Sequence, residues 1–466
     1  MKYSFQFLFF CLMLYLLSGC EETKVDLRPN VVFLFADDQR YNTIHHLANK
    51  EILTPHLDRL ASRGLSFTNA YIMGGTSGAV CAPSRAMLLT GKTLFHLDQE
   101  GEWNFPISTT DTTFIELLRH HGYVTFGVGK QHNGKEVVAR SFSEGGHFLF
   151  GGMSSHYDVP VFDFSSDSSY GDEKKYRVLG KHSTDLYKDD AINFIYSYQG
   201  KGPFLLYLAF QAPHDPRKMP DTYLQRYQNR EIELPPNFLP QHPFDNGELV
   251  IRDELLASFP RKEEEVLEHI RAYYAMISHL DNAIGEIITA IDKKGISDNT
   301  LIIFSADNGL AVGQHGLMGK QNLYEHSIKI PLILSGPGIP ENKSSDALCY
   351  LNDIYPTLCD YLSINPPATV ETGSFLKCVK NPDLPHRDHL TFAYKHYQRG
   401  IRKDHWKYIE YHVNGARHTQ LFDLKEDPYE TRNLALFIEN QNLVIQLREN
   451  LKHHWITLGD PSSFWE

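Results

Sequence analysis

Short apolar runs rich in Val, Ile, Leu and Phe alternate along the chain with segments whose apolar residues recur at helical spacing. The clearest runs predict strands at residues 30–36, 123–128, 204–210, 300–305 and 330–334. Between the third and fourth runs, residues 269–294 predict one long amphipathic helix. Strands that are apolar throughout and alternate with helices are typical of a mostly parallel sheet covered on both faces. The pattern therefore predicts an α/β fold.

The pattern changes near Pro366 and Pro367, where a polar stretch leads into segments typical of antiparallel strands joined by short turns. A helix is expected near residues 443–454, close to the end of the chain. We therefore expect a small C-terminal subdomain of mixed α and β structure beside the main sheet. The expected division is a signal at 1–19, a tether at 20–28, a catalytic α/β domain at 29–365 and the subdomain at 366–466.

Polar or ionisable residues follow four of the five predicted strands. They are Asp37 and Asp38 after the first, Lys130, Gln131 and His132 after the second, His214 and Asp215 after the third, and Asp307 and Asn308 after the fourth. The carboxyl ends of strands in an open α/β sheet meet at one crevice. We therefore expect these residues, which are far apart in sequence, to form one site.

Composition and charge narrow the class of function. The 466 residues are 42% hydrophobic, enough for a large packed core, and the formal net charge is -12. No basic run is present that would replace the counterions of a phosphate backbone, so nucleic acid is not an expected partner. An anionic substrate is still compatible, because a few local cations can dominate within a pocket.

The N-terminal twenty residues resemble a bacterial lipoprotein signal. One lysine precedes an apolar stretch and the sequence Leu17-Ser18-Gly19-Cys20. Cys20 would then carry the lipid and tether the protein to a bacterial membrane, at the cell surface or facing the periplasm, with no other membrane contact. An ordinary cleaved signal is the alternative. Four cysteines follow, Cys81, Cys349, Cys359 and Cys378; a disulfide among them is possible, but spacing does not fix the pairing.

Cys81 stands alone in the sequence, at the expected entrance of a helix. Pro83 suits a first helical turn, and Ala86 to Leu89 are good helix formers. The free N–H groups and the positive end of the helix favour an anion there, and Arg85 adds a full charge. Taken alone, Cys81 is either a low-pKa thiolate nucleophile or a buried, inert cysteine.

The segment CAPSRAMLLTGK at residues 81–92 resembles the signature of the type I sulfatases, in which the cysteine becomes formylglycine after translation. Further segments resemble this family in the same order: VVFLFADDQ, TPHLDRLASRGLSFTNAY, GYVTFGVGKQH, FLLYLAFQAPHDP, FSADNGLAVGQHGLMGKQNLYEHSIKIPLIL, DIYPTL and LFDLKEDPYETRNLA. The resemblance spans nearly the whole chain after the signal. It implies an alkaline-phosphatase-like α/β domain with a small C-terminal sheet subdomain, in agreement with the predicted layout.

The resemblance also implies a reaction. Cys81, as a formylglycine hydrate (3-oxoalanine in its aldehyde form), would attack the sulfur of a sulfate ester with one hydroxyl and expel sulfate with the other. A formylglycine-generating enzyme or an anaerobic sulfatase-maturating enzyme would be the partner that modifies it. Arg85 and Lys130 match positions that hold the diol and the sulfate, and His132 matches the histidine that assists hemiacetal breakdown. His214 and Lys320 match the pair near the leaving oxygen; His214 is the easier to tune near neutral pH, and Lys320 would need a depressed pKa to donate a proton.

A divalent cation is the expected cofactor. Asp37, Asp38, Asp307 and Asn308 are hard oxygen donors, the set expected for Ca²⁺ or Mg²⁺ rather than Zn²⁺. The resemblance assigns the same four residues to the metal, with residue 81 beside them, and we expect Ca²⁺.

Four further residues are candidates for substrate contact: His315, His156, His396 and Arg399. For the last three, ordinary surface solvation is the competing interpretation. The chain also departs from the family pattern at two places. Gln131 replaces the aromatic residue of the common GKWH and would alter the pocket wall, and Lys92 replaces the arginine of the common LTGR.

A lipid-anchored sulfatase that faces outward implies a sulfated poly- or oligosaccharide substrate. Ulvan or carrageenan from algae is expected first, and a host glycosaminoglycan is an alternative. Two other functions are also open: a formylglycine-dependent phosphonate or phosphate ester hydrolase, and a glycan-binding lipoprotein with an inactive site. None of the catalytic residues that the resemblance requires is missing, which argues against the last.

Overall fold

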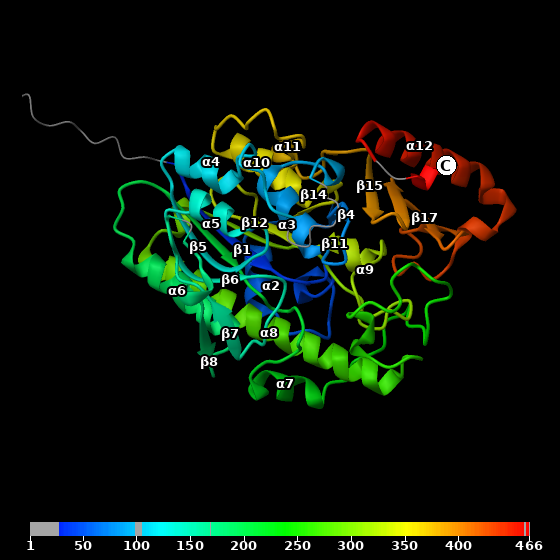
Figure 1. The fold of residues 1–466 in the computed structure, drawn as a ribbon, viewed down its shortest axis with the longest axis horizontal. Coiled ribbons are helices and arrows are strands. Elements are labelled where there is room, and N and C mark those ends of the chain that lie inside the picture. Colours follow the sequence, from blue (N-terminus) through cyan, green and yellow to red (C-terminus); the bar gives the residue numbers. More distant parts are fainter. Residues whose placement is uncertain (1–27, 98–104, 168, 461–462, 466) are drawn as a thin grey trace, which may run out of the picture.

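The computed structural model describes residues 28–97, 105–167, 169–460 and 463–465. The expected signal at 1–19 and Cys20 lie outside these residues. A large central sheet forms the body of the molecule, and a smaller sheet with a long terminal helix lies at one side of it (Figure 1). Within the described part of the chain, no helix combines the length and the apolar character that a membrane span requires.

The central sheet has eight strands in the order β13-β2-β12-β10-β1-β9-β5-β6. Its parallel part consists of β10 (Thr300–Ala306), β1 (Asn30–Ala36), β9 (Phe204–Ala209), β5 (Val124–Gln131) and β6 (Glu144–Phe150). The remaining strands are β12 (Leu332–Ser335), β2 (Leu65–Phe67) and β13 (Lys343–Ser345). Every residue of β1 and of β10 is buried, as expected of strands covered on both faces. The predicted mostly parallel α/β sheet is confirmed.

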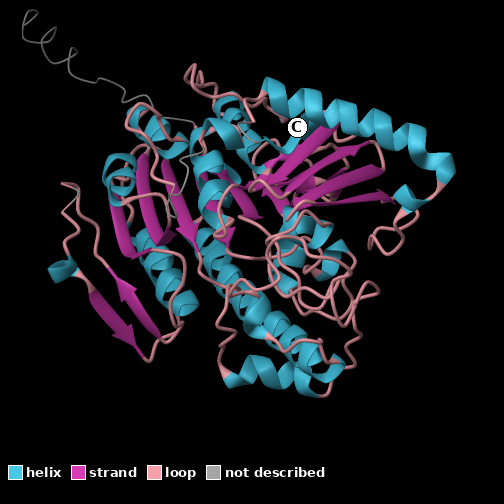
Figure 2. Ribbon diagram, turned by 45° about the vertical axis from the view of Figure 1, so that its right-hand side comes forward, coloured by secondary structure: helices cyan, strands magenta, loops and turns pink. Residues whose placement is uncertain are grey.

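Helices cover both faces of this sheet (Figure 2). Successive side chains of a strand point to opposite faces, so the apolar side chains of one strand pack against helices on both sides. Phe33 and Phe35 of β1 belong to one hydrophobic cluster, and Val32 and Leu34 belong to another. The first cluster includes residues of α3 (Cys81–Thr90), α4 (Phe114–His120), α5 (Lys135–Ser141), α10 (Ile354–Tyr361) and α11 (Leu376–Lys380). The second includes residues of α2 (Pro55–Ser62), α6 (Ser183–Ser197) and α8 (Glu263–Lys294).

The longest helix, α8, begins six residues before the predicted start at residue 269. Glu263, Glu264 and Glu265 form its first turn, where acidic side chains complement the positive end of the helix dipole. These residues lie outside the apolar stripe, so hydrophobic spacing alone does not reveal them. The shorter α7 (Asp221–Gln228) packs against α8 through Tyr227.

The fifth predicted strand, at residues 330–334, is divided in the structure. Pro331 separates β11 (Lys329–Ile330) from β12, and the two strands belong to different sheets. Proline has no N–H to donate to a ladder, so it is poorly placed within a continuous strand. β11 pairs with β3 (Ala70–Tyr71), which in turn pairs with β14 (Cys349–Tyr350). A further pair, β7 (Asp158–Val161) and β8 (Tyr176–Leu179), is antiparallel.

The C-terminal sheet consists of β15 (His389–Tyr394), β16 (Gln398–Lys403), β17 (Trp406–Val413) and β18 (Ala416–Asp423), with β4 (Gly74–Gly75) as a fifth strand. The first four are antiparallel, as predicted, but β4 comes from the N-terminal part of the chain and runs parallel to β15. The expected terminal helix is α12 (Gln441–Thr457), which buries Leu447, Leu451 and Trp455. The boundary between residues 365 and 366 stays a prediction.

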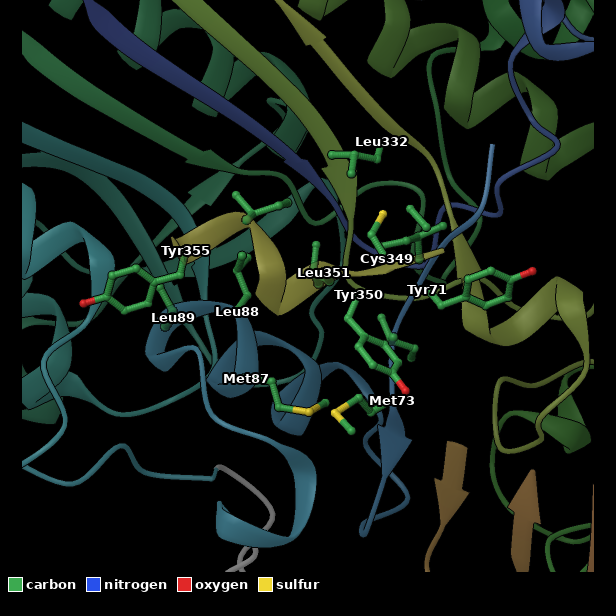
Figure 3. Close-up of a cluster of buried hydrophobic side chains, with 14 of the residues drawn as sticks. Tyr71, Met73, Met87, Leu88, Leu89, Leu332, Cys349, Tyr350, Leu351 and Tyr355 are labelled. Atoms are coloured by element: carbon green, nitrogen blue, oxygen red, sulfur yellow. The ribbon is translucent and has the colours of Figure 1, made fainter. Parts of the chain in front are cut away.

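The helix that begins at Cys81 is fixed by packing along its length. All ten residues of α3 are buried. Figure 3 shows Met87 beside Met73, and Leu88 near Leu351 and Tyr355. Leu351 lies in the short 3-10 helix Leu351–Asp353 that leads into α10, and Tyr355 lies in α10 itself. Because interiors are close-packed, this contact limits movement of α3 and hence of its first residue. The four cysteines of the described chain are all free thiols.

Candidate active site

The site lies where the carboxyl ends of four parallel strands meet the N-terminus of α3. Asp37 and Asp38 follow β1, Lys130 lies near the end of β5, His214 follows β9, and Asp307 and Asn308 follow β10. Cys81 is the first residue of α3. The N–H of Asp38 donates to Asp307 Oδ1 at 3.0 Å, so the ends of β1 and β10 are joined directly. The structure thus brings together residues separated by more than 200 positions in sequence.

Four oxygen-bearing side chains form a buried cradle. Asp37, Asp307 and Asn308 have no exposed surface, and Asp38 is 3% exposed. The Asn308 amide N–H donates to Asp38 Oδ1 at 2.6 Å. Potential ligand atoms of Asp37, Asp307 and Cys81 lie within 4.8 Å of one another. The pKa of Asp37 is raised to about 6. Burial is the largest cause, and the nearby negative charge of Asp307 is the second.

The cradle fits a hard divalent cation. Asp37 Oδ1 and Asn308 Oδ1 are buried and have no hydrogen-bond partner among the described residues. Buried polar atoms usually have a hydrogen-bond partner. Two buried oxygens without one, next to further carboxylates, are suitable ligands for a cation. An all-oxygen set suits Ca²⁺ or Mg²⁺ better than Zn²⁺. Asp37, Asp38, Asp307 and Asn308 are therefore the residues that would hold the metal.

Three cations neutralise the three carboxylates of the cradle. The pairs are Lys130 with Asp37, Lys320 with Asp38, and Arg85 with Asp307. Arg85 Nε lies 2.8 Å from Asp307 Oδ2, and Lys320 Nζ lies 2.5 Å from Asp38 Oδ1. Burial alone would raise the pKa of Asp307, but Arg85 and the lysines outweigh it and hold the pKa well below its usual range. Each carboxylate of the cradle therefore keeps its negative charge with the help of the cation paired with it.

Cys81 faces two of the basic residues, but its burial disfavours the thiolate form. Its Sγ lies 3.4 Å from His132 Nδ1 and 3.7 Å from Lys130 Nζ. The side chain is 2% exposed, and burial raises the pKa of the thiol despite the opposing effects of Lys130 and Lys320. Of the two interpretations of the lone cysteine, the reactive thiolate is therefore disfavoured in the unmodified protein.

His132 lies against the sulfur, in surroundings that favour the neutral ring. Burial, followed by Lys130, lowers its pKa well below the ordinary value. A neutral imidazole next to residue 81 is able to accept a proton from it. This geometry is compatible with the role that the resemblance assigns to His132, which stays a prediction.

His214 and Lys320 both approach Asp38. His214 Nε2 lies 3.6 Å from Asp38 Oδ2, and its Nδ1 bonds to the Asp215 carbonyl at 2.8 Å. A proton-donating Lys320 would need a depressed pKa. Burial lowers the pKa, but Asp38 and the surrounding charges outweigh burial and raise it well above the ordinary value. This shift disfavours Lys320 as the proton donor, and the donor role of His214 stays a prediction.

The candidates for substrate contact do not share one location. His156 and Arg399 have no exposed surface, and His315 is 5% exposed and stacks on Tyr324 with ring centroids 3.9 Å apart. Arg399 donates to both carboxylate oxygens of Asp460. His156 and Arg399 are thus enclosed by internal hydrogen bonds, which contradicts the surface solvation considered for them and disfavours direct contact with a sugar. His396 is exposed and stays a candidate.

Sequence reasoning missed one residue at the rim of the site. Arg252 donates to both carboxylate oxygens of Asp215, at 2.6 and 3.0 Å, and its side chain is half-exposed. It follows neither a predicted strand nor a motif, so its sequence neighbours give no signal. Of the two departures from the family pattern, Gln131 is 7% exposed, and Lys92 pairs with Asp111 at 2.7 Å. Lys92 thus has a structural partner.

Comparisons with known proteins identify the family of this chain. The sulfatase family model matches residues 29–364, which is more than half of the chain. The chain belongs to the sulfatase family. A second model, the C-terminal region of N-sulphoglucosamine sulphohydrolase, matches residues 313–456. This sulfatase is accordingly a sulfuric ester hydrolase, of a family that generally uses formylglycine and a divalent metal.

Three similar proteins place this sulfatase among enzymes with varied substrates. An N-acetylglucosamine-6-O-sulfatase of Bacteroides thetaiotaomicron is 26% identical over 93% of this chain and 88% of its own. An ulvan-active sulfatase of Formosa agariphila is 26% identical over 94% of this chain and 83% of its own. A protein solved with its substrate D-glucosamine-2-N,6-O-disulfate has a TM-score of 0.77 and 22% identity, covering 94% and 99% of the two chains. The last likeness concerns the fold.

The cradle predicts that Ca²⁺ stabilises the folded sulfatase. After chelator treatment, Ca²⁺ at about 100 times its dissociation constant should raise the free energy of unfolding by about 2.7 kcal/mol, because only the folded state holds the ligands together. Urea unfolding with and without Ca²⁺ measures this gain. It should be lost in Asp37→Asn but kept in Asp298→Asn, a control at an exposed carboxylate. An equal gain in both variants would place the bound ion elsewhere.

Proposed function

We propose that this sulfatase hydrolyses sulfate esters on a sulfated carbohydrate, with residue 81 converted to formylglycine and Ca²⁺ in the oxygen cradle. The position of Cys81 supports the proposal most strongly. It opens α3, lies within ligand distance of Asp37 and Asp307, and has Lys130 and His132 against its sulfur. An aldehyde hydrate there would supply the oxygen nucleophile, and the cation would balance charge that develops on the sulfate.

The chain's own residues have distinct tasks in this reaction. Lys130 lies close to residue 81, where its ammonium group would contact that residue and pair with the negative charge of a bound sulfate. Arg85, held by Asp307, adds a second fixed cation in a buried setting where charge is poorly screened. His132, neutral and beside residue 81, accepts a proton from it when sulfate leaves. His214 donates a proton to the departing sugar oxygen.

Sulfated algal polysaccharides or their oligosaccharides, of ulvan or carrageenan type, are the proposed substrates, and a glycosaminoglycan is the alternative. The ulvan-active relative supports the first, and the N-acetylglucosamine-6-O-sulfatase and the structure with glucosamine disulfate support the second. At the rim, the half-exposed Arg252 offers a charged group to a sugar. The exposed His396 stays a candidate for substrate contact.

A sulfate-release screen tests the function. Matured enzyme is incubated with defined ulvan, carrageenan and glucosamine-sulfate oligosaccharides, and inorganic sulfate is measured. We expect release from at least one of them and loss of turnover in Cys81→Ala, because that variant has no aldehyde to hydrate. Aryl phosphate and phosphonate esters are included as controls. A clear preference for a phosphorus ester, or activity retained by Cys81→Ala, would contradict the proposal.

We also propose that the mature protein is anchored to a bacterial membrane through a lipid on Cys20. The lysine, apolar stretch and Leu17-Ser18-Gly19-Cys20 sequence support this. Cys20→Ser should move the protein from the membrane fraction to the soluble fraction in its native host, because a lipid adds about 0.8 kcal/mol of membrane binding per buried CH₂. Immunoblots of the two fractions measure the shift. Equal membrane retention of both forms would show another mode of attachment.

A further inference from the structure

Two buried histidines lie behind the loop that carries His214. His156 has no exposed surface and His182 is 2% exposed. Their rings are stacked almost parallel, with 2° between the planes and 4.8 Å between the centroids. We propose that this pair positions His214 for its part in the reaction, by fixing two carbonyl groups of the loop at residues 211–218. The inference rests on the proposed function of His214.

The hydrogen bonds of His156 fix its tautomer. Its Nε2 lies 2.9 Å from the carbonyl oxygen of His214, and a carbonyl only accepts, so Nε2 carries the proton. Nδ1 is then an acceptor, and the Ser183 hydroxyl donates to it over 2.7 Å. Ser183 is the first residue of α6, so His156 links the backbone of His214 to the start of that helix.

His182 holds the same loop four residues further on. Its Nε2 bonds to the carbonyl oxygen of Lys218 at 3.0 Å, and its Nδ1 accepts from the N–H of Thr184 at 3.1 Å. The same tautomer follows, because Nδ1 accepts and Nε2 must donate. His182 also caps the N-terminus of α6. Both rings therefore connect the loop to a fifteen-residue helix that packs against α8.

The stack is compatible with neutral rings. Burial is the main cause that lowers the pKa of His156 to about 4 and that of His182 to about 3. Two neutral rings stack without like-charge repulsion, and each keeps one donor and one acceptor for the bonds described. On the far side, His279 packs edge-on against His182 at 4.6 Å and bonds to Asp185 at 3.1 Å. His279 thus packs against the His182 ring of the stack and is itself held by Asp185.

The placement of the His214 ring depends on its backbone. The ring is held by a bond from Nδ1 to the neighbouring Asp215 carbonyl, which moves with the same loop. Its Nε2 lies only 3.6 Å from Asp38, within the cradle. With His156 removed, the His214 carbonyl loses its side-chain partner and the loop is free to shift relative to the cradle. A misplacement of about 1 Å can cost a reaction about a hundredfold.

The test compares two substrates that differ in their need for a proton. One is 4-nitrophenyl sulfate, whose leaving group departs readily without protonation. The other is the sulfated sugar that wild-type enzyme desulfates fastest, whose alkoxide needs a proton. In His156→Ala, kcat on the sugar should fall about tenfold to a hundredfold, with KM little changed and with a much smaller fall on 4-nitrophenyl sulfate. His156→Gln, whose amide N–H can replace Nε2–H, should recover most of the loss.

Two further variants keep the result interpretable. Ser183→Ala removes the donor to Nδ1 and should show the same leaving-group dependence in a milder form, which covers the case in which His156→Ala does not fold. His242→Ala is the matched control, because His242 is 3% exposed and bonds to Phe244 and Tyr324, outside the 211–218 loop. It should lower the unfolding temperature and leave the ratio of the two rates unchanged.

The outcomes distinguish a failure of this inference from a failure of the proposed sulfatase reaction on which it rests. If wild-type enzyme releases sulfate but His156→Ala and Ser183→Ala slow both substrates equally, or no more than His242→Ala does, the pair serves the fold alone and the inference is wrong. If wild-type enzyme cleaves neither sulfate ester, the proposed function itself fails.

Discussion

A buried balance of charge at the ends of β1 and β10 is the constraint on which the rest of the structure depends. Asp37, Asp38 and Asp307 are almost completely enclosed, and enclosing unpaired carboxylates is costly. Arg85, Lys130 and Lys320 offset that cost, one cation for each carboxylate. These six residues come from five separate segments, so the sheet order, the packing of α3 and the loop that carries Lys320 must all be correct for the balance to exist.

This balance also explains how an acidic protein can bind an anion. The chain carries a formal net charge of -12, yet three cations and three carboxylates in the site sum to zero. A divalent cation bound in the cradle would make the site positive by two, which favours a sulfate ester over a neutral ligand. In a buried setting these local charges outweigh the distant surface charge, because they are close to the substrate and poorly screened.

Much of the fold follows from the sequence, because buried parallel strands and a long amphipathic helix leave strong periodic patterns. Polar residues after four strands, read with the rule for open α/β sheets, also indicate where the site lies. Other features depend on pairing at long range and leave little pattern. The two-residue strand at Gly74 joins the C-terminal sheet, and Pro331 divides a run that looks continuous. His156 lies in a polar segment, yet its ring is buried. Its two nitrogens bond to Ser183 and to the His214 carbonyl, so burial leaves neither nitrogen without a partner.

The proposed reaction depends on the chemical state of residue 81. The direct measurement is mass spectrometry of the tryptic peptide at residues 64–85, made on enzyme preparations that differ in how completely they were matured and followed by the sulfate-release rate of each. The account predicts that the rate rises in proportion to the fraction of peptide in which an aldehyde replaces the thiol of Cys81. A preparation with only unmodified Cys81 that still releases sulfate at the full rate would contradict it.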